Sequence, residues 1–258
     1  MVTKSREHCI SVVINTYNAE RLLEEVIESI KGFDEIVVCD MESTDHTVEI
    51  AERHGCKIVT FPKAGHKSAE PARTFAIQSA SNKWVFVVDA DEIVTPQLRD
   101  YLYDYISKDE CKSGLYIPRK GYFMHRFFSY PDYQLRFFIR EGTIWPPYVH
   151  TFPKVNGQLE YIPAKFTELA LIHKADDNIH TILHKTNEYT DNEVEKKKDR
   201  KYGAMALVFR PLWCFLRSYI IKGKIFKGCP GFISSVLDSH YQFVVISKII
   251  ERRNASNT

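Results

Sequence analysis

Trp84-Val85-Phe86-Val87-Val88-Asp89-Ala90-Asp91-Glu92 is the segment of this chain with the clearest structural pattern. Five apolar residues, most of them β-branched or aromatic, run directly into a group of carboxylates. A short, continuous apolar run of this kind predicts a strand buried on both faces of a parallel sheet. The carboxylates then lie at the carboxyl end of the strand, where open α/β sheets bind their ligands.

Asp89 and Asp91 are separated only by the small Ala90, a spacing that suits a cation site. One carboxylate can ligate a divalent cation directly while the other acts through water or a substrate hydroxyl. Hard oxygen ligands favour Mg²⁺ or Mn²⁺ carrying substrate phosphates. The alternative is that the acids only favour the start of the next helix. That helix has its own start signal in Thr95 and Pro96, which places the acids in the loop before it.

Bulk composition excludes several classes of protein. The 258 residues fit one large domain, or one domain with an appendage, and a net charge of +2 argues against nucleic acid as the main partner. The six cysteines lack Cys-x-x-Cys and zinc spacings, which predicts reduced thiols in a cytosolic protein. Residues 1–8 are polar and do not resemble a secretory signal. We also expect no membrane-spanning segment, since no apolar stretch approaches about 20 residues.

Before residue 90, strand-like and helix-like segments alternate, which predicts a parallel nucleotide-binding sheet with right-handed crossovers. The predicted strands are 9–14, 35–39, 57–61 and 84–88, and the predicted helices are 19–30, 47–54 and 70–81. Polar side chains therefore meet at one edge of the sheet. Of these, Asp40 can accept hydrogen bonds from a base or a ribose, and Tyr17 can support a base. Arg73 begins a helix, where a cation is electrostatically unfavourable, and this favours a phosphate partner.

Four segments in this order resemble the family 2 glycosyltransferases with the GT-A fold: Asn15–Glu20, Asp40–Ile50, Ala72–Ile77 and Asp89–Glu92. The chain is similar to bacterial enzymes that add sugars to lipopolysaccharide core or other cell-envelope glycans. The resemblance implies a Rossmann-like mixed α/β sheet flanked by helices. It also implies inverting transfer from a nucleotide diphosphate sugar, usually UDP-linked, with Mn²⁺ or Mg²⁺ as cofactor.

Roles for individual residues follow from the same resemblance. It places the nucleoside among Thr16, Tyr17, Glu20 and Asp40, the diphosphate near Arg73, and the cofactor against Asp89, Ala90 and Asp91, with Asp91 as principal metal ligand. Two departures bear on donor preference. The chain has Met41-Glu42 where the family often has Ser-Gly, and His46 where the family often has Gly.

Residues 111–175 are rich in aromatic residues, and we expect antiparallel strands at 114–118, 133–140 and 148–152 that form the acceptor side. Transfer to a hydroxyl needs a base. The first candidate is Asp132, in a Pro-Asp-x-Gln-x-Arg pattern shared with the envelope enzymes; the alternative is an Asp in a proline-containing turn. His150 is a third metal ligand, a diphosphate contact or a strand histidine.

Three further histidines lie beyond the predicted acceptor strands. His180 and His184 have a helical i, i+4 spacing, which suits a metal, but the segment favours surface or packing roles. His173 falls at a Leu-x-His position of the family and can line the acceptor cleft.

From about residue 188 the composition changes. Ten Lys or Arg and one acid lie between Lys196 and Lys227, interleaved with apolar clusters. This pattern is typical of an amphipathic segment on a membrane surface. The alternative is a helical hairpin, started or broken at Pro211, with a turn at 228–231 and a second helix at 232–250; both interpretations can hold together.

The predicted organisation is a catalytic domain at 1–187, with a nucleotide-sugar half at about 1–100 and an acceptor half at about 101–187. A helical membrane-associating segment, 188–258, follows. We expect a metal-dependent glycosyltransferase, cytoplasmic and peripheral on the inner face of the membrane, using a glycan or glycolipid acceptor. The alternatives are transfer to a polyisoprenyl phosphate and a non-catalytic nucleotide-binding protein of the membrane surface. A nucleotidyltransferase or a dinucleotide oxidoreductase would need a glycine-rich first loop, which 15–18 lack.

Overall fold

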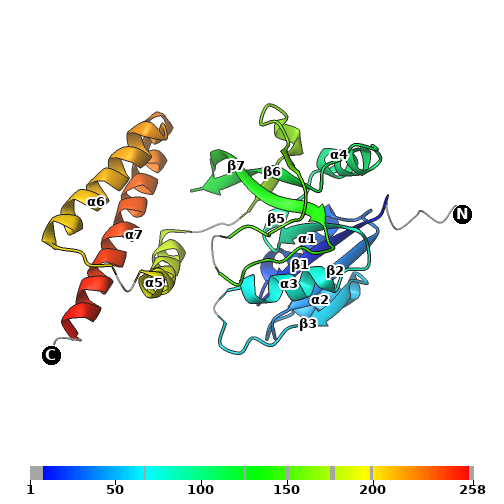
Figure 1. Ribbon diagram of the computed structural model, residues 1–258, viewed down its shortest axis with the longest axis horizontal. Coiled ribbons are helices and arrows are strands. Elements are labelled where there is room, and N and C mark those ends of the chain that lie inside the picture. The colour runs from blue at the N-terminus through cyan, green and yellow to red at the C-terminus, as the bar shows by residue number, and fades with distance from the viewer. Residues whose placement is uncertain are drawn as a thin grey trace, which may run out of the picture. The chain divides into compact units, whose positions relative to one another are not determined.

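The structure, a computed structural model, describes residues 8–66, 68–124, 126–148, 151–174, 178–197 and 200–255. The chain divides into two compact units, one of residues 1–122 and 129–175 and one of residues 123–128 and 176–258 (Figure 1). The helical unit thus begins at 176, before the boundary of 188 expected from composition. The reason is that the helix Ile179–Lys196, which runs through the expected boundary, packs on the last helix of the chain.

The first unit is built on a mixed sheet with the strand order β3-β2-β1-β4-β7-β6-β9-β5, and β8 pairs with β6. Its first half is parallel, as the alternation predicts, while β7 runs antiparallel to β4. Every residue of β1 is buried, including the polar Ser11, Asn15 and Thr16 beside its apolar residues. The strands are β1 Ile10–Thr16, β2 Glu35–Asp40, β3 Lys57–Thr60, β4 Trp84–Asp89, β5 Glu92–Ile93, β6 Gly114–Phe123, β7 Arg126–Ile139, β8 Leu159–Tyr161 and β9 Leu171–His173.

Helices cover both faces of this sheet (Figure 1). One core contains alternate residues of β1 and β4 packed against helices α1 (Glu20–Ser29) and α4 (Pro96–Ile106). The other core packs the opposite faces of the same strands against α3 (Glu70–Gln78). Helix α2 (Thr47–Arg53) follows β2, and a short 3₁₀ turn spans Thr167–Leu169. Thr95 caps α4 as predicted, because its side-chain oxygen accepts the Leu98 N–H at 3.1 Å.

One predicted strand is wrong. Within 148–152, residues 149 and 150 lie outside the described residues, and the remaining three are not in a strand. Prolines at 146, 147 and 153 flank the segment, and proline cannot donate the hydrogen bond that a sheet ladder needs. An isolated bridge between Ile144 and Lys154 closes this loop.

The second unit consists mainly of three helices, in which α7 (Gly228–Ala255) contacts both α5 (Ile179–Lys196) and α6 (Ala204–Leu216). A π-helical turn, Arg217–Ile221, extends α6, and a 3₁₀ turn, Lys224–Lys227, precedes α7. Two expectations need correction. Pro211 lies inside α6 instead of ending it. The reversal comes before Gly228, because Gly223 supplies a left-handed φ of 68° there.

The expectation that no stretch could span a membrane also needs correction. In the part of the chain that the structure describes, one helical stretch, Ala204–Ile221, is long and apolar enough to do so by length and composition. Only 11% of it is buried within the protein.

Candidate active site

The carboxyl ends of β2, β1 and β4 lie side by side, which brings together the polar residues that follow three separate strands. The strand register pairs Thr16 with Asp40 and Asn15 with Asp89. The edge expected from the sequence therefore exists, and it is the edge at which α/β sheets bind ligands.

Asp40 forms a buried polar corner at this edge. Its Oδ1 accepts the Thr16 hydroxyl at 3.0 Å and the Ser43 hydroxyl at 2.6 Å, and its Oδ2 accepts the Ser43 N–H at 2.9 Å. A buried carboxylate in such a hydrogen-bonded setting is held in one orientation, which suits recognition of a polar ligand edge.

Tyr17 and Glu20 are also predicted around the nucleoside. Their side chains differ in how free they are to contact a ligand. Tyr17 is half-exposed, with the Lys63 ammonium 3.6 Å from the centre of its ring. Glu20 is engaged by His46, since one carboxylate oxygen accepts the His46 N–H at 3.0 Å and lies 2.8 Å from Nδ1. The hydrogen bond with Glu20 raises the pKa of His46. Glu20 therefore holds the loop before α2.

The Met41-Glu42 departure has a structural explanation. Met41 is buried in the core, so its bulk does not enter the site. Glu42 has a left-handed φ of 61°, a conformation that glycine adopts most easily. Its side chain accepts the Lys63 N–H at 3.0 Å, which ties this turn to the segment that carries the cation on Tyr17.

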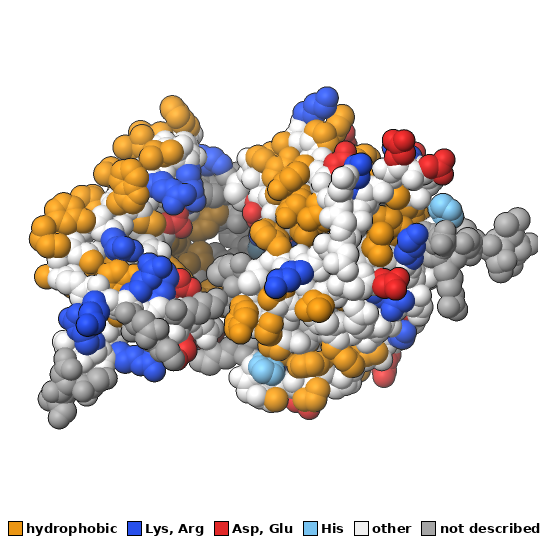
Figure 2. Space-filling view, in the orientation of Figure 1, with side chains coloured by type: hydrophobic (Ala, Val, Ile, Leu, Met, Phe, Trp, Pro, Cys, Tyr) orange, Lys and Arg blue, Asp and Glu red, His pale blue; other side chains and the backbone are white. Residues whose placement is uncertain are grey.

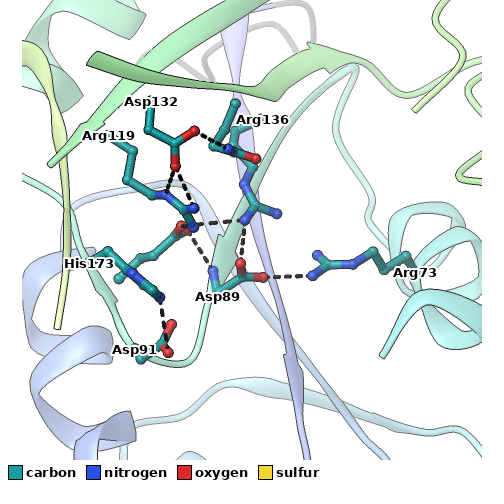
Figure 3. A network of polar contacts seen from close by, with 9 residues as sticks. Arg73, Asp89, Asp91, Arg119, Asp132, Arg136 and His173 are labelled. Carbon is teal, nitrogen blue, oxygen red and sulfur yellow. Dashed lines mark hydrogen bonds and ion pairs between the residues drawn. The ribbon is translucent and has the colours of Figure 1, made fainter. Parts of the chain in front are cut away.

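Asp89 is held between two arginines (Figure 3). Arg73, from α3, donates to Oδ1 at 2.8 Å, and Arg136, from β7, donates to Oδ2. Burial would raise the pKa of Asp89, but the charges of Arg136 and Arg73 outweigh it and lower that pKa. The Trp145 ring lies over both guanidinium groups, with 4.5 Å from its centre to Cζ of Arg73 and 5.8 Å to Cζ of Arg136. Because both carboxylate oxygens are engaged, the geometry does not favour Asp89 as a direct metal ligand.

A second set of ion pairs joins this cluster to Asp132. Glu92, whose side chain is 0% exposed, accepts from Arg119 at 3.1 Å and from Arg136 at 3.3 Å. Arg119 also donates to Asp132 Oδ2 at 3.0 and 2.6 Å, and Gln134 donates to Oδ1 at 3.1 Å. Asp132 is thus a positioned carboxylate on β7, joined through Glu92 and the arginines to the end of β4.

Asp91 points away from the arginines and toward His173 (Figure 3). Its Oδ2 lies 3.3 Å from Nε2 of His173, and its side chain is 36% exposed. Burial would lower the pKa of His173, but the hydrogen bond and charge of Asp91 raise it overall. Among the described residues, Oδ1 of Asp91 has no hydrogen-bond or ion-pair partner. Asp91 and His173 are therefore the carboxylate and imidazole most available to a cation.

The sequence also indicated four other residues, namely Ala90, His150, His180 and His184. His150 lies outside the described residues. Ala90 is half-buried and packs on the core beside α1. His180 and His184 are exposed on α5, as the surface interpretation predicts. In the described ranges, no group of three or more His, Cys, Asp or Glu could hold a metal alone.

Sequence reasoning missed three residues of the cluster, Glu92, Arg119 and Arg136, as members of the site. The signal for Arg136 was the Pro-Asp-x-Gln-x-Arg pattern that also indicated Asp132. The signal for Glu92 was its place in the Asp89–Glu92 segment, whereas Arg119 belongs to no such pattern.

A mixed α/β sheet flanked by helices, with acidic residues at the carboxyl ends of its parallel strands, is the architecture of transferases with the GT-A fold. The profile described as Glycosyl transferase family 2 matches residues 11–156, more than half of the chain. This chain belongs to glycosyltransferase family 2.

The relatives agree with this assignment. An uncharacterized glycosyltransferase of Rickettsia typhi is 26% identical and covers 94% of this chain and 87% of its own length. A lipopolysaccharide core biosynthesis glycosyltransferase of Rhizobium meliloti is 25% identical over 94% of this chain and 92% of its own length. A solved structure of glucosyl-3-phosphoglycerate synthase from Mycobacterium tuberculosis, with Mn²⁺, UDP and product, is 26% identical over 44% of each chain with a TM-score of 0.39.

Proposed function

We propose that this glycosyltransferase moves a sugar, with inversion, from a nucleotide diphosphate sugar to a hydroxyl of a cell-envelope glycan or glycolipid. The proposal is supported by the position of three residues, Asp40, Tyr17 and Asp91, at the carboxyl ends of adjacent strands. Asp40 is the acceptor for nucleoside polar groups, and Tyr17 flanks the base. A UDP-linked donor fits the family resemblance.

The residues at Asp91 fit a divalent cation. The carboxylate has an oxygen to offer, and the His173 imidazole lies beside it. One carboxylate with one imidazole suits Mn²⁺. Mg²⁺ also fits, because it usually keeps several coordination positions for water and substrate phosphate oxygens. When bound, such an ion neutralises the departing diphosphate. In this proposal Asp89 braces the loop through Arg73 and Arg136 and does not itself ligate the ion.

Asp132 is proposed as the base. The acceptor hydroxyl gives its proton to the carboxylate, its oxygen forms the bond to the anomeric carbon, and the bond from that carbon to the diphosphate breaks. Arg119 and Gln134 fix the orientation of the carboxylate. Removal of a positioned base of this type typically costs about 10²–10⁴-fold in rate.

Lipopolysaccharide core is the proposed acceptor class, because a relative of nearly equal length carries that activity in its name. A lipid-anchored acceptor is presented at a membrane surface. The second unit offers exposed apolar side chains and cations suited to peripheral association with the inner leaflet.

The test is a panel of nucleotide sugars, screened by calorimetry and by release of the nucleotide diphosphate, with and without Mn²⁺. Metal-dependent binding of one donor, lost in Asp91→Asn with the fold intact, is the expected result. Full turnover in Asp91→Asn would contradict the cation assignment. Donor binding without release of the nucleotide diphosphate would favour the non-catalytic nucleotide-binding alternative, and absence of binding by any donor would contradict the proposed donor site. Transfer to a polyisoprenyl phosphate needs no base, so an unchanged rate in Asp132→Asn would favour that acceptor.

A further inference from the structure

Helix α6 and its π-helical extension present a mixed face toward α7. The Pro211 carbonyl accepts from Ser239 at 2.9 Å, Cys214 donates to the Asp238 carbonyl, and the Ser218 hydroxyl donates to Asp238. Leu207 packs on the core of the second unit, and the ring centre of Phe215 lies 5.6 Å from that of Phe232. A helix that packs on a protein core normally turns its large apolar residues inward.

Most of the other large apolar residues of α6 and its π-helical extension are exposed. They recur at intervals of three and four residues, which places those of α6 on one face. We call this set the outer stripe; it consists of Met205, Val208, Phe209, Leu212, Trp213, Leu216 and Ile220. Figure 2 shows hydrophobic side chains gathered over this helix with Lys and Arg beside them.

Cations accompany the outer stripe, while acids do not. Arg210 and Arg217 are both exposed and lie seven residues apart, which is two helical turns. Lys222 and Lys227 are exposed in the turn that follows, where Phe226 is 91% exposed. Residues 204–227 contain no Asp or Glu. An apolar face bordered by cations alone complements an anionic lipid surface.

We infer that the outer stripe lies in the plane of an anionic membrane leaflet, at the boundary of headgroups and acyl chains, and that α6 does not cross the bilayer. Crossing would carry α7 into the bilayer as well, because the two helices are joined at Pro211, Cys214 and Ser218. The bilayer would then hold Asp238 and the Lys224 that pairs with it at 2.7 Å. An in-plane position leaves that pair on the aqueous side. The inference rests on the membrane association proposed above and adds the surface and its depth.

The fluorescence of Trp213, a residue of the native sequence, can report how deeply α6 enters the membrane. It is 61% exposed, while Trp84 and Trp145 are buried, so quenching by brominated lipid reports Trp213. It lies in the middle of Ala204–Ile221, so a spanning helix puts it near the bilayer centre. An in-plane helix puts it about 5–10 Å below the headgroups.

The experiment uses the full chain with vesicles of phosphatidylcholine, with and without phosphatidylglycerol, brominated at shallow or deep acyl positions. We expect binding that needs the anionic lipid, quenching strongest with shallow bromines, and loss of quenching but not of binding in Trp213→Phe. Arg210→Gln/Arg217→Gln should bind roughly 30-fold more weakly, since each cation near the surface contributes about a factor of five. The control Arg21→Gln/Arg53→Gln removes the same charge from the first unit and should bind as the wild type does.

Each of the following results would contradict a different part of the inference. Deepest quenching at the bilayer centre means that α6 spans. Binding without quenching places the contact elsewhere and leaves peripheral association standing. Absence of binding to all vesicles, with a stable dimer in sedimentation, means that the stripe covers a second copy, and both the inference and the proposed membrane association then fail.

Discussion

A comparison of Asp89→Asn with Asp91→Asn distinguishes the structural role proposed for the first carboxylate from the metal-binding role proposed for the second. Asp89 lies between Arg73 and Arg136, and the Arg136 side chain is 4% exposed. Loss of the charge leaves buried guanidinium groups with Glu92 as the remaining counter-ion. Breaking a buried pair from one side typically costs about 3–5 kcal/mol of unfolding free energy. Asp91 is partly exposed, with His173 as its neighbour, so Asp91→Asn should lower the unfolding free energy by less than about 1 kcal/mol.

The assay is urea unfolding of both variants, followed by circular dichroism, together with donor transfer measured at a temperature where each remains folded. We expect Asp89→Asn to shift the urea midpoint strongly, and Asp91→Asn to leave the midpoint almost unchanged while transfer is lost. A loss below about 1 kcal/mol in Asp89→Asn would refute the bracing role assigned to the arginines. Equal destabilisation by both variants would refute the division of roles.

Three further results are expected. Asp132→Asn should lower the rate of transfer to a hydroxyl acceptor about 10²–10⁴-fold, with donor affinity measured by calorimetry unchanged. Asp40→Asn should weaken nucleotide binding about 10-fold or more, because a hydrogen bond to a charged group contributes about 1.5–3 kcal/mol; unaltered binding would remove Asp40 from the nucleoside site. Because the folded-state pKa of Asp89 is lowered, its stabilisation is present above the ordinary aspartate pKa of 3.8 and is lost as the pH falls below it toward the folded-state pKa. Acid unfolding should therefore depend less steeply on pH below 3.8 in Asp89→Asn than in the wild type, as urea midpoints across pH 2–5 would show.

The parallel half of the sheet could be predicted closely from the sequence, because strands buried on both faces leave continuous apolar runs. The run at 84–88 corresponds to β4, Trp84–Asp89, and the run at 35–39 to β2, Glu35–Asp40. The acceptor half was harder. Strand β7 extends back to Arg126. Its Asp132 faces an ion pair with Arg119, and periodicity does not report such a position. The strand predicted at 148–152 failed because flanking prolines outweighed its aromatic composition.

The candidate site divides along the same line. Residues that follow strands, such as Asp40 and Asp91, could be placed because parallel strands end at one edge. Arg119 and Arg136 could not, because their roles depend on how β6 and β7 are aligned with β4. The same limit explains His173, which reaches Asp91 only because β9 pairs with β5.

The ion-pair cluster has a consequence for engineering acceptor choice. Arg136 on β7 and Arg119 on β6 pair with Asp89 and Glu92, which precede residue 100 in the chain. A chimera that takes residues 111–175 from another member of the family would leave the buried Glu92 without its counter-ions, and Asp89 with Arg73 alone, unless the graft brings matching guanidinium groups. The segments before and after residue 110 are therefore exchangeable only as electrostatically matched pairs.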